Sequence, residues 1–133
     1  MEKKDLLKDV IKHIDIKSYN STELIDAMRN MSFTSRDTAR AADILMMMCK
    51  EKECTNILTL AGSTSAAGCM QVYVDMVRNK MIDVVVATGA SIIDMDLFEA
   101  LGFKHYIGEK ENVIADTTLR DLYIDRIYDT YID

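Results

Sequence analysis

The chain has 133 residues, a formal net charge of −6 and a hydrophobic fraction of 49%. This length is enough for one compact domain with its own core but is short for a two-domain enzyme. The acidic balance argues against nonspecific binding to nucleic acid or to an anionic membrane, which needs a basic surface. No apolar run approaches the ~20 residues of a membrane span.

The amino-terminal residues alternate between apolar and charged side chains at helical spacing. Residues 2–17 are therefore expected to form a helix or arm, and we divide the chain into a helical arm, 1–17, and a domain, 18–133. His13 lies beside the apolar stripe and is expected to be solvated or to cap a helix rather than to act in catalysis. The stripe, which could also pack on a neighbouring subunit, consists of Leu6, Leu7, Val10, Ile11 and Ile14.

The flanking segments predict further helices. Residues 20–23 carry helix-start chemistry before Leu24, and a long helix is expected over 36–52 with Thr34 or Ser35 as its cap. Past Gly108, residues 109–116 are expected to form a loop and residues 117–122 a short helical turn. The spacing of Cys49, Cys54 and Cys69 is unlike that of a zinc site, so we expect no metal, reduced thiols and a cytoplasmic protein.

The central residues 56–108 contain two strand–loop–helix patterns. Ile57–Ala61 is followed by the small-residue loop Gly62–Ser65, and Val84–Ala87 by the loop Thr88–Ser91. The second strand is continuous and β-branched, which predicts that it is covered on both faces. Helices are expected after both loops, the first on the face formed by Ala66, Met70, Tyr73, Val74, Val77 and Met81.

This alternation predicts a parallel sheet with right-handed crossovers. Both loops then lie at the carboxyl edge of the sheet, where open α/β sheets bind ligands. Their small residues let a ligand approach the backbone closely, and the N–H groups at a helix start suit a phosphate or a carboxylate. The ligand itself does not follow from this pattern.

Five blocks in this order resemble the deoxyhypusine synthase family, including its deoxyhypusine synthase-like branch. The likeness runs from about residue 16 onward. The blocks are Met31–Arg36 leading into Ala39–Ala41, Leu60–Gly68, Ile82–Ala90, Leu97–Gly102 with His105–Gly108, and Arg126–Thr130.

The resemblance implies a Rossmann-like parallel sheet flanked by helices, with NAD as the cofactor. It also implies transfer of the aminobutyl group of spermidine, through an imine on an enzyme lysine, to a lysine of a translation factor. Members act as oligomers whose active sites cross subunit interfaces, so a homo- or hetero-oligomer is expected. The positions that match the cofactor-contacting loops are Ser63, Thr64, Ser65, Thr88, Gly89 and Ala90.

The sequence departs from the family pattern in two places. A pair of adjacent glutamates that holds the polyamine is replaced by Ser91–Asp96, where Asp94 and Asp96 either hold the amine or serve as helix-start carboxylates. The family's catalytic lysine lies in a second half that these 133 residues do not include. No catalytic residue is therefore expected in this chain, and the fold is expected to be incomplete relative to the family.

Three other functions stay open at this point. The first is an enzyme of the same fold that uses a small free amine, such as putrescine or agmatine, as acceptor. The second is a noncatalytic partner subunit of a full-length paralogue. The third is a small α/β domain that binds an unrelated nucleotide.

Overall fold

The computed structural model describes residues 1–108 and 113–133. They form an α/β fold of two compact units. The first unit contains Met1–Ile14, Leu60–Gln71 and Ala87–Asp133, and the second contains Asp15–Thr59 and Val72–Val86. The prediction of a loop over 109–116 falls partly on residues outside the described ranges. Residues 113–115 have no regular structure.

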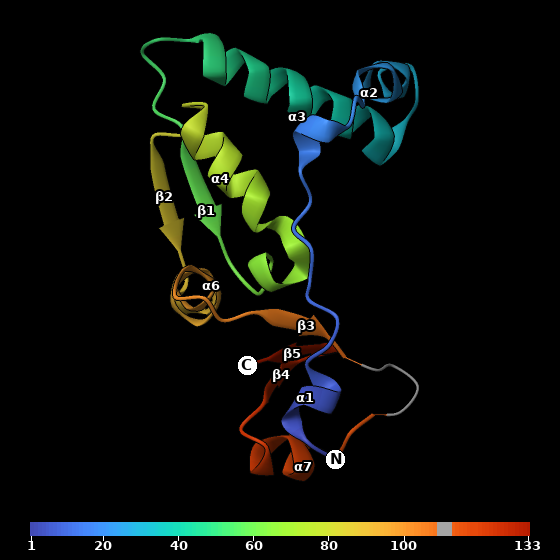
Figure 1. The fold of residues 1–133 in the computed structure, drawn as a ribbon. Helices are drawn as coiled ribbons and strands as arrows, with labels where there is room; N and C mark the ends of the chain where they lie inside the picture. Colours follow the sequence, from blue (N-terminus) through green and yellow to red (C-terminus); the bar gives the residue numbers. More distant parts are fainter. Residues whose placement is uncertain (109–112) are drawn as a thin grey trace. The chain divides into compact units, whose positions relative to one another are not determined.

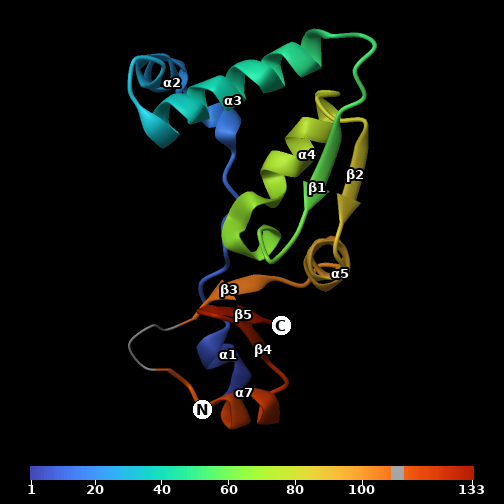
Figure 2. The same cartoon turned by 180° about the vertical axis from the view of Figure 1, so that it is seen from behind.

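The second unit holds helices on a short parallel sheet. Its helices are α2 (Thr22–Met28), α3 (Phe33–Lys50) and most of α4 (Met70–Arg78). Strands β1 (Ile57–Leu60) and β2 (Val84–Ala87) pair in the same direction, and α4 runs alongside β1 in both views (Figures 1 and 2). The predicted strand–helix–strand unit is therefore confirmed.

The prediction that β2 is covered on both faces is wrong. Val84, Val85 and Val86 are 42%, 39% and 56% exposed, and Ile57 of the neighbouring strand is 57% exposed. A continuous β-branched run indicates that a strand has apolar side chains on both faces, but it does not identify the residues that would bury them. Within the described chain, β2 pairs only with β1 and keeps much of its apolar surface open.

Two helix predictions also need correction. Of the helix or arm expected over residues 2–17, only α1 (Lys3–Leu6) and a 3-10 turn at Ile16–Ser18 are helical. Between them Val10 forms an antiparallel bridge with Tyr106, because backbone pairing there replaces the local helical pattern. Helix α3 begins at Phe33 with Ser32 as its N-cap residue, earlier than the predicted cap at Thr34 or Ser35.

The first unit contains an antiparallel sheet that the sequence did not predict. Strands β3 (His105–Ile107), β5 (Thr130–Ile132) and β4 (Asp125–Ile127) lie in that order, with α7 (Asp116–Asp121) close to the predicted turn. Its buried core joins α1, α7 and the sheet (Figure 1) through Leu6, Leu119, Ile124 and Tyr131. The β4–β5 hairpin turns at Tyr128 with φ of 51°, a left-handed conformation that turn-forming glycine or asparagine normally marks.

Gly108 provides a steric test of this packing. A Cβ atom at Gly108 would lie 2.8 Å from the Asp129 carbonyl oxygen and 3.0 Å from the Tyr131 ring. Gly108→Ala is therefore expected to lower the free energy of unfolding by about 1 to 3 kcal/mol, measured by chemical denaturation. Gly89→Ala, whose Cβ would meet open space, is the matched control. Equal stability of the two variants would contradict this packing.

Among the residues that the structure describes, no helix combines the length and apolar character that a bilayer crossing requires. The same residues include no group of three His, Cys, Asp or Glu side chains placed to hold a metal ion. Cys49, Cys54 and Cys69 are free thiols.

Candidate functional site

The two small-residue loops emerge at the same end of the parallel sheet. The Thr88 backbone N–H donates to the carbonyl of Leu60 at 3.1 Å, which links the carboxyl ends of β1 and β2. The fully buried Ser91 hydroxyl donates to the carbonyl of Gly62 at 2.7 Å. The prediction that both loops line one edge of the sheet is confirmed.

The first loop combines an open backbone with buried hydroxyl groups. Gly62 has φ of 76°, a conformation that favours glycine, and a Cβ there would meet nothing within 4 Å. Ser65 is fully buried, whereas Ser63 and Thr64 are half-buried. Within residues 1–108 and 113–133, the hydroxyl oxygens of Thr64 and Ser65 are buried and have no hydrogen-bond partner. Buried polar groups without a hydrogen-bond partner are rare in folded proteins, so each one requires an explanation.

The helix after this loop is bent rather than regular. Ser65–Cys69 forms a π-helical turn, Gly68 has φ of 94°, and α4 starts only at Met70. A Cβ on Gly68 would lie 3.2 Å from the Lys12 carbonyl oxygen, so the amino-terminal segment passes close to the turn. The Met95 sulfur accepts the Ala66 backbone N–H at 3.3 Å and holds the turn from the other side.

A pocket of about 490 Å³ lies beside the first loop, within the size range of small-molecule sites. Its walls are residues 61–64, Ala66 and Ala67 of the loop region, Ile11 of the amino-terminal segment and the β4–β5 turn, 127–130. Of the predicted cofactor contacts, Ser63 and Thr64 line this pocket and Ser65 is buried next to them in the chain. Thr88 and Gly89 are exposed and Ala90 is half-buried in the adjoining second loop.

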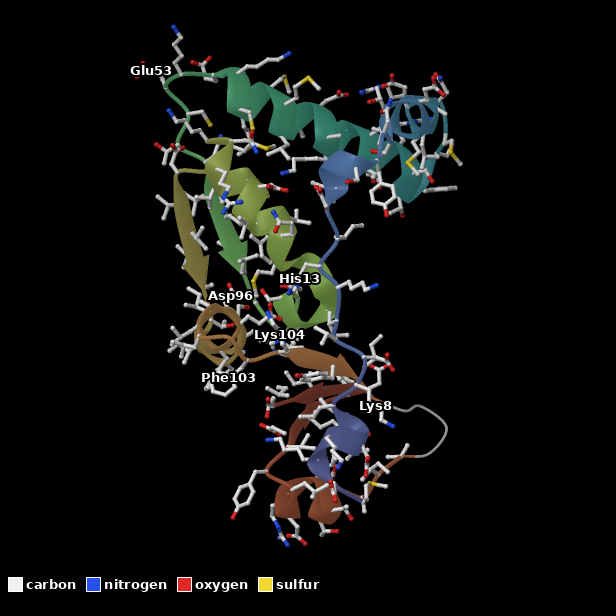
Figure 3. All side chains as sticks on the ribbon, in the orientation of Figure 1. Lys8, His13, Glu53, Asp96, Phe103 and Lys104 are labelled. Atoms are coloured by element: carbon white, nitrogen blue, oxygen red, sulfur yellow. The ribbon has the colours of Figure 1, made fainter. Side chains whose placement is uncertain are left out.

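The second loop leads directly into a helical run formed by α5 (Gly89–Ser91), a π-helical segment (Ile92–Leu97) and α6 (Phe98–Ala100). Asp94 and Asp96 lie two positions apart on this run, so their side chains leave it in different directions. Asp94 lines a pocket of about 360 Å³ together with Asp125 and Asp133. Asp96 (Figure 3) is half-buried, and its Oδ1 has no hydrogen-bond partner in the described ranges. Asp96 is not among the residues that line the pocket beside Asp94.

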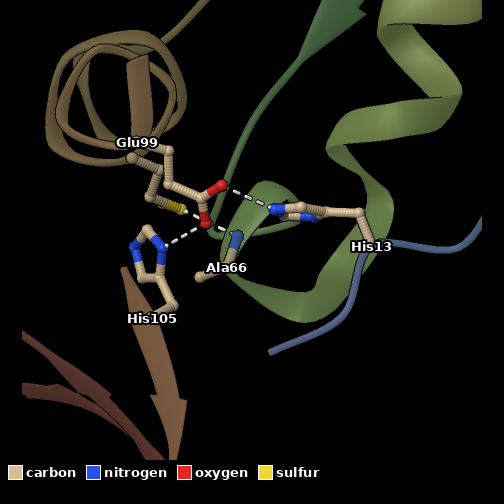
Figure 4. Close-up of polar contacts among 5 residues, drawn as sticks. His13, Ala66, Glu99 and His105 are labelled. Atoms are coloured by element: carbon tan, nitrogen blue, oxygen red, sulfur yellow. Dashed lines mark hydrogen bonds and ion pairs between the residues drawn. The ribbon is translucent and has the colours of Figure 1, made fainter. Parts of the chain in front are cut away.

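The expectation of a solvated or capping role for His13 is wrong. His13 Nε2 lies 2.7 Å from Glu99 Oε2, and His105 Nδ1 lies 2.7 Å from Glu99 Oε1 (Figure 4). The chain has two histidines, and both form a hydrogen bond with the Glu99 carboxylate. Sequence reasoning missed this cluster because Glu99 is 86 residues from His13 and lies in the helix predicted to follow the second loop, to which no functional role was given.

Burial and hydrogen bonding act in opposite directions on Glu99. Burial raises its carboxyl pKa, but the hydrogen bonds and charge interactions with His13 and His105 outweigh burial and leave the pKa below its ordinary value. The side chains of His105, Glu99 and His13 are 1%, 10% and 20% exposed. Glu99 therefore stays ionised in a cluster largely shielded from water.

The comparisons with known proteins agree with the blocks singled out in the sequence. The deoxyhypusine synthase family model matches residues 23–133. A deoxyhypusine synthase-like protein of Caulobacter vibrioides is 64% identical over 132 residues, which cover 99% of this chain and 35% of that protein. One of Coxiella burnetii is 58% identical over 131 residues, covering 98% and 37%, respectively.

A probable deoxyhypusine synthase 2 of Methanosarcina acetivorans is 37% identical over 118 residues, covering 89% of this chain and 33% of that protein. The chain thus spans about a third of the length of these relatives. The family model covers most of the chain, including both loops and the helices that follow them. The chain therefore belongs to the deoxyhypusine synthase family.

Proposed function

We propose that this chain supplies the cofactor-loop part of a deoxyhypusine synthase-like transferase. The complete enzyme would use NAD to oxidise spermidine and transfer its aminobutyl group, through an imine on an enzyme lysine, to a lysine of a translation factor. The observation that carries the proposal is the hydrogen-bonded pair of Gly/Ser/Thr loops at one end of the sheet, with a pocket beside the first. Family membership supports the choice of chemistry.

The residues of the first loop fit a dinucleotide in two respects. Gly62 leaves its backbone accessible, and the Thr64 hydroxyl is a buried polar group in need of a partner at the pocket wall. We assign Ser63, Thr64 and Ser65, together with Thr88, Gly89 and Ala90, to cofactor binding. NAD, when bound, supplies a hydride acceptor for the oxidation of a carbon beside an amine nitrogen.

The lysine that forms the imine is proposed to come from sequence outside these 133 residues. A lysine activated for this chemistry needs a desolvated or cation-neighboured pocket. Lys80 is exposed, and so is Lys104 (Figure 3). The open apolar surface of β2 further supports assembly with additional chain, because exposed β-branched strands favour pairing or cover. A complete Rossmann-like sheet and an oligomer belong to this proposal.

Reconstitution tests the proposal. The chain is mixed with a complementing fragment, defined as a polypeptide holding the remaining two thirds of the Caulobacter relative. The mixture is given NAD, spermidine labelled in its aminobutyl group and the translation factor. Label is expected on the translation factor only when both polypeptides and NAD are present. Absence of labelled product from a mixture that forms a stable complex would contradict the proposal.

An enzyme of the same fold with a small free amine as acceptor is the second candidate. It is favoured by the segment Ser91–Asp96 in place of the family's adjacent glutamates and by the higher identity to deoxyhypusine synthase-like proteins than to the probable deoxyhypusine synthase. The same reconstitution with putrescine or agmatine in place of the translation factor separates the two. Label in a small amine alone supports the second candidate, and label in the protein alone excludes it.

A further inference from the structure

The His13–Glu99–His105 cluster has no part in the proposed cofactor contacts. It joins three segments of the first unit: the amino-terminal segment (residues 8–14), helix α6 and strand β3 (Figure 4). His13 Nδ1 and His105 Nε2, the ring nitrogens turned away from Glu99, are buried and lack a partner among the described residues. Among the described residues, each ring therefore makes one side-chain hydrogen bond, and both bonds go to the Glu99 carboxylate.

Backbone contacts place the amino-terminal segment between β3 and the turn Ser65–Cys69 that follows the first loop. The Ile11 N–H donates to the His105 carbonyl at 2.8 Å, and the Ile107 N–H donates to the Asp9 carbonyl at 2.7 Å. Further along, the Ile14 N–H donates to the Gly68 carbonyl at 2.9 Å. His13 lies between these two attachments in the chain, and its side chain adds a third attachment through Glu99 at 2.7 Å.

The same segment forms a wall of the 490 Å³ pocket. Ile11 lines that pocket together with the loop residues Gly62, Ser63 and Thr64. A segment at a sheet edge that is held by a few backbone bonds opens readily. Two hydrogen bonds to an ionised and largely buried carboxylate are stronger than neutral ones and resist that opening.

We infer that His13, Glu99 and His105 form a clip that positions the amino-terminal segment as a wall of the ligand pocket. These three residues are positioning residues, because they act on the ligand through Ile11. The inference rests on the proposed function only for the identity of the ligand, NAD. The clip itself can be tested without any ligand.

The test compares His13→Ala with His13→Gln. The glutamine side chain carries an amide nitrogen that can donate from about the position of His Nε2, whereas alanine leaves Glu99 with one donor. In the chain alone, His13→Ala is expected to speed hydrogen exchange of the Ile11 and Ile14 amides at least about tenfold, and His13→Gln to restore slow exchange. With the complementing fragment, His13→Ala is expected to weaken NAD binding at least about fivefold, with recovery in His13→Gln.

Lys17→Ala is the matched control, because Lys17 bonds to the buried Asp75 inside the second unit at 2.7 Å. It is expected to leave both readouts unchanged. Unchanged exchange in His13→Ala overturns the clip, and faster exchange with unchanged NAD affinity overturns its role as a pocket wall. If the unsubstituted complex fails to bind NAD, the proposed function fails, while the exchange data still decide whether the clip exists.

Discussion

Gly62→Val is expected to weaken NAD binding by the reconstituted complex about 100-fold. The left-handed backbone at Gly62, with φ of 76°, costs a β-branched residue about 1 to 2 kcal/mol. The added side chain would also occupy space at the pocket wall that is empty around Gly62. The backbone strain lowers stability in the free and the bound chain alike, so the loss of affinity comes from the side chain in the space of the ligand. A factor of about 100 in affinity corresponds to about 3 kcal/mol, which calorimetric titration with NAD measures directly.

Gly102→Val tests whether backbone strain alone, without a new side chain in the pocket, lowers the NAD affinity. Gly102 has φ of 104° and, like Gly62, has open space where a Cβ would lie, but it follows α6 and is not among the residues that line this pocket. Its substitution is expected to lower stability by a similar amount and to leave NAD affinity within about twofold. Equal loss of affinity in the two variants would show that general destabilisation, and not the first loop, governs binding.

Glu99→Ala is expected to cost about 2 to 3 kcal/mol of unfolding free energy at neutral pH, because it removes the acceptor shared by the buried His105 and the half-buried His13. The pH dependence follows from the lowered carboxyl pKa. Between its folded pKa and the ordinary value of 4.5, the unfolded chain binds more protons at Glu99 than the folded chain does. The stabilisation is therefore fully present above pH 4.5 and is lost as the pH falls through the folded pKa.

Urea denaturation of the unsubstituted chain and Glu99→Gln from neutral to acidic pH measures this effect. Ionisation of Glu99 is expected to leave the difference in unfolding free energy between the unsubstituted chain and Glu99→Gln constant above about pH 5. The difference is expected to shrink below pH 4.5. Glu53→Gln, at an exposed carboxylate (Figure 3), serves as the control and should not change the profile. A difference between the chain and Glu99→Gln that persists undiminished at low pH would contradict the lowered pKa.

The central part of the fold follows from local sequence patterns. The continuous apolar runs at Ile57–Leu60 and Val84–Ala87 predicted both strands, and the small residues after them predicted both loops and their shared edge. Periodicity also located α3, with an error of three residues at its start, and the turn at α7. These features depend on residues that are neighbours in the chain, so a single sequence contains the signal.

The features that were missed depend on contacts between distant residues. Val10 pairs with Tyr106, and this long-range bridge overrides a stripe that is helical in pattern. The hairpin at Tyr128 has a left-handed residue without the glycine or asparagine that normally signals it. Glu99 meets His13 across 86 residues, and no spacing rule connects a carboxylate to a histidine over that distance.

The central claim is that the two loops at the carboxyl end of the sheet hold one dinucleotide. Titration of NAD into the isotope-labelled chain, bound to the complementing fragment and followed by NMR, tests this claim directly. The account predicts saturable shifts of the backbone amides of Gly62–Ser65 and Thr88–Ala90, with the amides of α2 unchanged. Saturable binding that shifts other amides and leaves both loops unperturbed would contradict it.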